Sequence, residues 1–175
     1  MVELGPPFPL ACDTRGAPHA WYEYKEAHRR VVESEIDSII EGAPTQLVAL
    51  DWRSVVEQKI SRAIAGRIPR LDADIERTFL GDGVYELKDP LSSSGGRTTL
   101  LRLYLVDLES REGTATISCF KAAEKFVCET DAERTKSFQD ADIEEASHRC
   151  DRTCATGRFW RMGRGPSSRP PVRPW

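Results

Sequence analysis

The sequence has no long apolar run and no basic excess. None of its apolar stretches approaches the roughly 18 residues of a membrane-spanning helix, so we expect no membrane association. The formal net charge of −3 and the isoelectric point near 5.7 argue against non-specific coating of nucleic acid, because such binding needs many cations to displace counterions from phosphates. A localised basic site is still compatible with this charge balance.

The sequence also lacks a secretion signal, a recognisable metal-binding motif and a regular cysteine pattern for disulfides. Residues 1–16 contain neither a basic segment nor a continuous apolar segment, so we expect a cytoplasmic protein. The five cysteines are an odd number at irregular spacing, which is typical of free thiols in a reducing compartment. His148 lies near Cys150 and Cys154, but a structural zinc site usually needs four ligands at a recognised spacing. We therefore expect no metal and no other cofactor.

The length and apolar content that are present suit one folded domain. A chain of 175 residues with 39% hydrophobic residues is long enough for a single core without covalent staples. Proline-rich residues 1–18 predict an irregular arm, and residues 19–152 predict the folded domain. The Gly-, Pro- and Arg-rich residues 153–175 predict a disordered tail that could recognise nucleic acid or an acidic partner.

Apolar periodicity predicts a strand and two helices in the first half of the chain. The strand covers residues 19–24, and the first helix covers residues 25–41 and closes at Gly42. The second helix covers residues 45–65, where glycine and proline follow as stop signals. Its apolar side is expected to contain Leu47, Leu50, Val55, Ile60 and Ile64. The two helices would form a hairpin.

The second half of the chain predicts three strands and a last helix. The runs at 84–88, 100–106 and 114–120 are rich in β-forming residues, and the loops between them have the composition of an antiparallel meander. Residues 137–152 open with a capping-box spacing and carry a modest apolar stripe. The expected fold class is therefore α+β, with a helical hairpin packed on a small, mostly antiparallel sheet and a C-terminal helix.

This order of elements over residues 20–150 resembles the RelE/ParE toxin superfamily, in particular its HigB-like, phage-associated branch. Four short segments carry the resemblance: GVYELK at 83–88, similar to a strand ending in Glu-Leu-Arg; Arg102 of LLRLYLV, similar to a tyrosine-arginine strand; Phe120-Lys121 with Lys125, similar to Phe-x-Lys-Lys; and Ile143-Glu144-Glu145-Ala146 with Arg149, similar to a terminal helix. The resemblance implies a RelE-like fold.

The resemblance to the RelE/ParE superfamily also implies a function. Members of this superfamily are toxins of type II toxin–antitoxin systems, and many are metal-independent, ribosome-dependent mRNA endoribonucleases. The implied partners are a cognate antitoxin, expected to be a small helix-turn-helix protein, and the ribosome with its mRNA. The alternative is a catalytically inactive RelE/ParE-like binding module, such as a DNA gyrase inhibitor or a phage-derived interaction protein.

Metal-free RNA cleavage needs cations around the reacting phosphate, and four residues are the catalytic candidates. Arginine presents a planar fork to phosphate oxygens, and a lysine with a lowered pKa can transfer a proton. The candidates are Lys88, Arg102, Lys121 and Lys125, which would share one face if the three strands are adjacent. Each has a structural alternative: Lys88 as a solvated strand end, Arg102 paired with a carboxylate such as Glu86, and the other two lysines as surface charges beside Glu124.

Three further residues are RNA-binding candidates. Tyr85 and Tyr104 could stack on bases, although strand tyrosines are more often packing residues, and Arg149 matches the terminal-helix motif. HigB-like sequences often place a histidine just before the phenylalanine of the last strand, where this chain has Ser118 and Cys119. A catalytic acid from that position is therefore missing.

Overall fold

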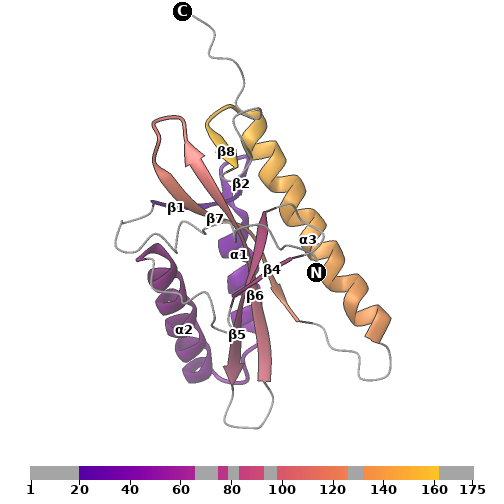
Figure 1. The fold of residues 1–175 in the computed structure, drawn as a ribbon. Coiled ribbons are helices and arrows are strands. Elements are labelled where there is room, and N and C mark those ends of the chain that lie inside the picture. The colour runs from indigo at the N-terminus through magenta and orange to yellow at the C-terminus, as the bar shows by residue number, and fades with distance from the viewer. Residues whose placement is uncertain (1–19, 66–74, 79–82, 93–97, 126–131, 162–175) are drawn as a thin grey trace, which may run out of the picture.

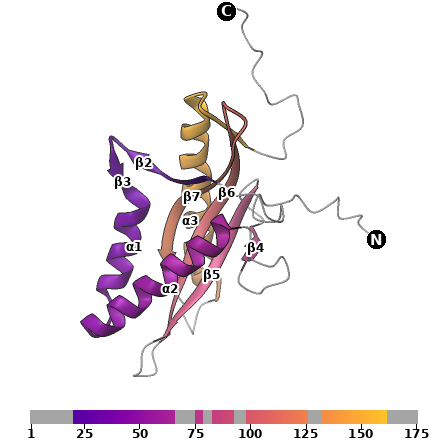
Figure 2. The same ribbon diagram turned by 90° about the vertical axis from the view of Figure 1, so that its left-hand side faces the viewer.

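The computed structural model describes residues 20–65, 75–78, 83–92, 98–125 and 132–161, and these residues form an α+β structure with three helices. Helices α1 (Val31–Glu41) and α2 (Gln46–Ile64) lie on one side of a six-stranded sheet, and α3 (Ala132–Ala155) lies on the other (Figures 1 and 2). Within these segments no helix is both long and apolar enough to cross a membrane. The expected α+β class with a mostly antiparallel sheet is confirmed.

The sheet has the order β1-β7-β6-β5-β4, with β8 paired to the end of β6. Its strands are β1 (Ala20–Glu23), β4 (Ile75–Arg77), β5 (Val84–Ser92), β6 (Thr98–Ser110), β7 (Ala115–Glu124) and β8 (Phe159–Arg161). β1 runs parallel to β7, and every other pairing in this sheet is antiparallel. The three predicted strands thus form the central meander, and each is longer than its apolar run because polar residues extend the ladders.

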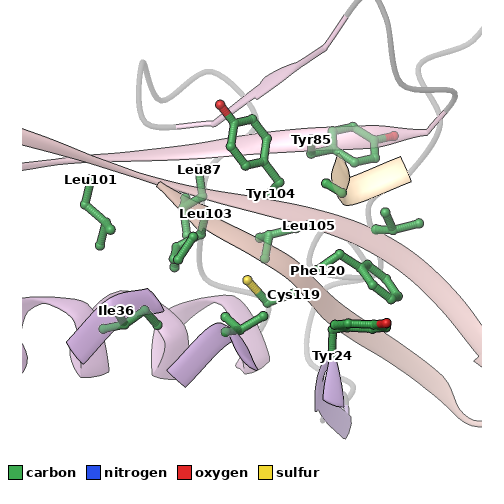
Figure 3. Close-up of a cluster of buried hydrophobic side chains, with 14 of the residues drawn as sticks. Tyr24, Ile36, Tyr85, Leu87, Leu101, Leu103, Tyr104, Leu105, Cys119 and Phe120 are labelled. Carbon is green, nitrogen blue, oxygen red and sulfur yellow. The ribbon is translucent and has the colours of Figure 1, made fainter. Parts of the chain in front are cut away.

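The main core lies between the sheet and the helical pair. Leu103 and Leu105 alternate with polar residues along β6, so both point to the same face of the sheet. Figure 3 shows them above Ile36 of α1, while the Tyr104 ring points away from that helix. Both leucines are almost fully buried. Cys119 on β7 is completely buried in the same cluster.

Helix α1 begins six residues later than the sequence predicts. Residues 25–30 instead form the hairpin of β2 (Lys25–Glu26) and β3 (Arg29–Arg30). The turn between them places Ala27 and His28 at positive φ, 46° and 70°, which neither residue type signals in advance. The predicted closure at Gly42 is confirmed, because its N–H bonds to the carbonyl of Ile39.

Helix α2 has nearly the predicted bounds but a different buried side. Thr45 caps it, and its hydroxyl accepts a hydrogen bond from the Val48 N–H at 3.2 Å. The buried side carries Trp52, Val56, Lys59 and Ala63. Leu47 and Leu50, predicted to face the core, are instead 77% and 61% exposed. The prediction was wrong because it followed the leucines, whereas Trp52 sets the side that packs.

Helix α3 is longer than predicted at both ends. It starts at Ala132, so the expected capping box at 137–140 lies within the helix, and it ends at Ala155. Phe159–Arg161 then form β8 against β6, so regular structure extends past the boundary expected at residue 152. The N-terminal arm and residues 162–175 lie outside the described part of the chain.

Candidate functional site

Strand register brings three of the four catalytic candidates to one face of the sheet. Lys88 pairs with Arg102 across β5 and β6, and Tyr104 pairs with Lys121 across β6 and β7. Paired residues, and residues two apart on a strand, share a face, so these four lie opposite the leucines. Lys125 directly follows β7, and its N–H donates to a β6 carbonyl at 2.7 Å. The predicted convergence of Lys88, Arg102 and Lys121 therefore occurs.

Helix α3 covers this face and supplies polar partners. We call the resulting set the polar cluster: Glu35 of α1; Glu86, Arg102, Tyr104 and Lys121 of the sheet; and Gln139, Asp142, Glu145 and Arg149 of α3. The contacts within this cluster determine whether the predicted cations are available to bind a phosphate.

Arg102 forms a buried ion pair with Glu86. Its Nε lies 2.7 Å from Oε1 of Glu86, and the two side chains are only 6% and 2% exposed. The second carboxylate oxygen accepts a hydrogen bond from Nε2 of Gln139 at 2.9 Å, which ties the pair to α3. A guanidinium inside an apolar strand requires such a partner, because an unpaired buried charge is costly. The structural alternative for Arg102 is the one that forms.

Lys121 lies between two carboxylates. Its Nζ is 3.1 Å from Glu35 of α1 and 3.9 Å from Asp142 of α3. Glu35 also accepts the N–H of Ala122 at 2.8 Å. The ladder from β1 reaches only to Cys119, so Glu35 satisfies a donor on the open edge of β7.

Arg149 of α3 also contacts the open edge of β7. It bonds to Glu145 at 2.7 Å, to Glu35 at 2.9 Å and to the carbonyl of Phe120 at 2.9 Å. The guanidinium also lies 5.3 Å from the centroid of the Tyr24 ring. Burial acts to lower the pKa of Arg149, but the hydrogen bonds to the two glutamates outweigh it and the pKa rises. Arg149 is thus fully engaged inside the protein.

Two groups of the polar cluster have shifted pKa values. Burial raises the pKa of the Tyr104 hydroxyl, the charge of Glu86 adds to the shift, and the neighbouring Arg102 opposes it. Burial also raises the pKa of the Asp142 carboxyl, against the opposing charge of Lys121 and with a further rise from Glu35. Tyr104 therefore remains a neutral phenol, and burial favours the protonated form of the Asp142 carboxyl.

The cations of the polar cluster are already paired with carboxylates of the chain. Arg102 pairs with Glu86, Lys121 with Glu35 and Asp142, and Arg149 with Glu35 and Glu145. Lys88, on the same face, and Arg152, 3.9 Å from Glu145, add positive charge nearby. Tyr85 and Tyr104 are 9% and 0% exposed, so neither presents a ring to a base. Tyr85 pairs in register with Leu105, so it does not belong to the polar row. Lys88 and Lys125 are half-buried.

Comparison of the chain with protein-family models, curated proteins and solved structures finds no match. The function therefore has to follow from the contacts described here. Among the described residues, no group of three or more His, Cys, Asp or Glu side chains is placed to hold a metal ion.

A pocket that the sequence does not predict lies between α1, α2 and β1. We call it the α1–α2 pocket; it has a volume of about 200 Å³. Its lining residues are Trp21, Glu23, Arg30, Val32, Glu33, Ile36, Ile40, Arg53, Val56, Glu57 and Ile60. The aliphatic residues of α1 and Val56 are buried and form the floor, whereas the charged residues other than Glu23 are more exposed and form the rim.

Sequence analysis identifies six of the nine members of the polar cluster but not Glu35, Gln139 and Asp142. Glu145 and Arg149 are four residues apart, a spacing that brings side chains together on a helix, so this pair was detectable. Glu35, Gln139 and Asp142 carry no such signal, because their partners lie on other elements. Only the packing of α1 and α3 against the sheet brings them into reach.

Proposed function

We propose that this chain is a RelE/ParE-like toxin module that acts by binding a protein partner and not by cutting RNA. The observation that carries this proposal is the ion pair between Arg102 and Glu86, buried beneath α3. To reach an RNA phosphate, Arg102 would have to exchange Glu86 for the phosphate and α3 would have to leave the sheet. Both steps separate charges that now form a buried ion pair.

The family assignment in this proposal is supported by the arrangement of elements. Strand β1, the α1–α2 pair, the β5–β6–β7 meander and α3 follow in the order on which the resemblance rests. The motif residues occupy regular elements as the resemblance requires, with Lys88 in β5, Arg102 in β6, Lys121 in β7 and Arg149 in α3. The proposed partners are a cognate antitoxin and DNA gyrase or another host protein.

Binding of a protein is also supported by the exposed side of α2. Leu47 and Leu50 are one helical turn apart and are mostly exposed, next to the polar N-terminal end of the helix. Large apolar side chains in such a position are suited to contact with another protein. α3 carries a single comparable residue in its described part, Phe138, at 47% exposure.

The experiment compares growth arrest in induced bacterial cultures. We expect the Leu47→Ser/Leu50→Ser variant to lose the arrest, while Phe138→Ser, a matched change on α3, keeps it. The Arg102→Met/Glu86→Leu variant, which removes the ion pair but retains its volume, should also arrest growth. Purified protein added to a gyrase supercoiling assay then tests that particular partner. A folded wild-type protein that leaves growth unchanged would contradict the toxin part of the proposal.

A second candidate, the ribosome-dependent mRNA endoribonuclease, is favoured by one observation. Lys88, Arg102 and Lys121 share one face across three adjacent strands. Mapping of transcript ends after induction separates the two candidates. New ends that appear with wild-type protein and vanish with Arg102→Met/Glu86→Leu would establish cleavage and overturn the non-catalytic proposal.

A further inference from the structure

The C-terminal end of α3 holds two free thiols one helical turn apart. Cys150 is completely buried, and Cys154 is half-buried where the helix packs against the core. Residues four apart on a helix lie on the same side of it, and here the thiol of Cys150 forms a hydrogen bond with the thiol of Cys154. We call this pair the α3 dithiol.

The two thiols of the α3 dithiol differ in reactivity. The hydrogen bond with Cys154 raises the pKa of Cys150, and burial raises it further. Cys150 therefore keeps its proton, whereas Cys154 has the more accessible sulfur and accepts the hydrogen bond. A sulfur that solvent can reach, and that a neighbouring S–H group stabilises as a thiolate, is the one that reacts with an oxidant.

Cys119 provides a contrast within the same protein. It pairs in register with Leu105, so it faces α1 and α2 and not α3 (Figure 3). Its S–H group donates to the carbonyl of Lys121 at 3.5 Å, and burial raises the pKa of the thiol. A completely buried thiol whose hydrogen bond goes to a carbonyl is expected to be inert. Cys119 is thus an internal control for the α3 dithiol.

A bond between the two sulfurs would change the end of α3. Cβ atoms four residues apart on a helix are separated by about 5–6 Å, whereas a disulfide needs about 3.5–4.5 Å. The last turn therefore has to unwind for the bond to form. Cys154 is the next-to-last residue of α3, so the change is confined to a helix end, where unwinding costs least. A disulfide formed in this way is strained and readily reduced.

The same turn of α3 also holds β8. The carbonyl of Cys154 accepts a hydrogen bond from the N–H of Gly157 at 2.9 Å, and the positive φ of Gly157, 71°, closes the helix there. β8 follows directly and pairs with β6. Its Arg161 donates to the carboxylate of Asp151 at 2.9 Å. Unwinding around Cys154 therefore disturbs contacts that keep β8 in the sheet.

We infer that the α3 dithiol is a reversible oxidation site for hydroperoxides, in which Cys154 is oxidised first and Cys150 then closes a disulfide that loosens β8. In the first step an oxygen atom passes from the hydroperoxide to the sulfur of Cys154, which gives a sulfenic acid and either water or an alcohol. In the second step the sulfur of Cys150 attacks that of Cys154, the S–O bond breaks, and hydroxide leaves with the proton of Cys150 as water. This inference goes beyond the proposed function and does not depend on it.

Tryptic peptide mapping of the full chain after treatment with hydrogen peroxide tests the inference. Arg152 lies between the two cysteines, so trypsin separates Cys150, in the peptide CDR, from Cys154, in the peptide TCATGR. We expect these peptides to be linked by a disulfide after oxidation and to separate again with dithiothreitol, while Cys119 stays reduced. Recovery of Cys154 without a link to Cys150, or oxidation of Cys119 to the same extent, would overturn the inference.

Two serine variants determine the order of the steps. In Cys150→Ser the sulfenic acid of Cys154 has no second thiol to react with, so dimedone should label Cys154 several-fold more than in the wild-type protein. In Cys154→Ser, Cys150 should remain unlabelled. Labelling of Cys150 in that variant would contradict the assignment of Cys154 as the sulfur that reacts first.

Hydrogen exchange of the oxidised and reduced proteins tests the effect on β8. The amides of Gly157 and of β8 should exchange several-fold faster after oxidation, because the last turn of α3 no longer holds them. The amides of Leu103 and Leu105 in the centre of the sheet should not change. Equal exchange rates at Gly157 and β8 in the two states would show that the disulfide leaves β8 in place, against the inference.

Discussion

The two faces of the central sheet are held against their helices by different interactions. The face toward α1 and α2 is lined by leucines such as Leu103 and Leu105, whereas the face toward α3 carries Glu86, Arg102 and Tyr104 from the same strands. Apolar burial is non-directional and tolerates small adjustments, but a buried ion pair needs one particular partner at one distance. A row of cations on a sheet can bind an external anion only if carboxylates of the same chain do not already pair with those cations.

The largest effect is expected from breaking the ion pair on one side only. Arg102→Met leaves Glu86 as an uncompensated buried carboxylate, so the free energy of unfolding should fall by about 3–5 kcal/mol. Urea unfolding monitored by circular dichroism measures this change. Arg102→Met/Glu86→Leu removes both charges and should recover most of the loss. If the double variant is as unstable as the single one, the pair has a role other than mutual compensation.

A large but smaller effect is expected on the leucine face. Leu103→Ala opens a cavity in the core and should lower the free energy of unfolding by about 2–4 kcal/mol, measured in the same urea experiment. Leu50→Ala on the exposed side of α2 is its matched control and should change stability little. Similar losses at the two leucines would contradict the assignment of faces to α2.

An intermediate effect is expected at the open edge of β7. Glu35→Gln keeps an acceptor for the N–H of Ala122 but removes the charge that faces Lys121 and Arg149. We expect a loss of about 1–3 kcal/mol, because two partly buried cations lose their shared partner. Glu33→Gln, on the same helix with a 40% exposed side chain, should cost far less. Hydrogen exchange at Ala122 reports whether the edge itself opens.

The smallest effect concerns the pH dependence. Burial raises the pKa of Asp142 in the folded protein, so the folded state binds this proton more readily than the unfolded state. Its contribution to stability is present at low pH and is lost as the pH rises through the raised pKa. Asp142→Asn should therefore flatten the stability profile between mildly acidic and neutral pH. A steeper profile in the variant would reverse the sign assigned here.

The sequence predicted the leucine face far better than the polar face. Runs rich in β-forming residues identified β5, β6 and β7, and Thr45 and Gly42 marked helix ends, because these signals are local. The same register logic brought Lys88, Arg102 and Lys121 together. What the sequence could not supply was the cover over them, since the partners of Lys121 lie 86 residues away on α1 and on a separate helix.

Local signals also misled where tertiary contacts took over. Residues 25–30 have charged composition suited to a helix end, yet they form a hairpin with Ala27 and His28 at positive φ. Leu47 and Leu50 were assigned to the core side because they lie on the apolar side predicted by helical periodicity. The packing of Trp52 turned that side of α2 outward. The hairpin pairs residues that are neighbours in sequence, whereas α2 packs against β5, which is distant in sequence.

The parallel pairing of β1 with β7 has a consequence for how the chain is made. Ala20 finds its neighbour Thr116 only after roughly 100 further residues have been synthesised, and loops of this length close slowly. Until then the exit of β1 from the ribosome leaves Trp21 and Tyr22 without the strand that shelters them. Among the described strands of the sheet, β1 is therefore translated before the others and is one of the last to pair, which makes it the natural point for a chaperone or a neighbouring nascent chain to intervene.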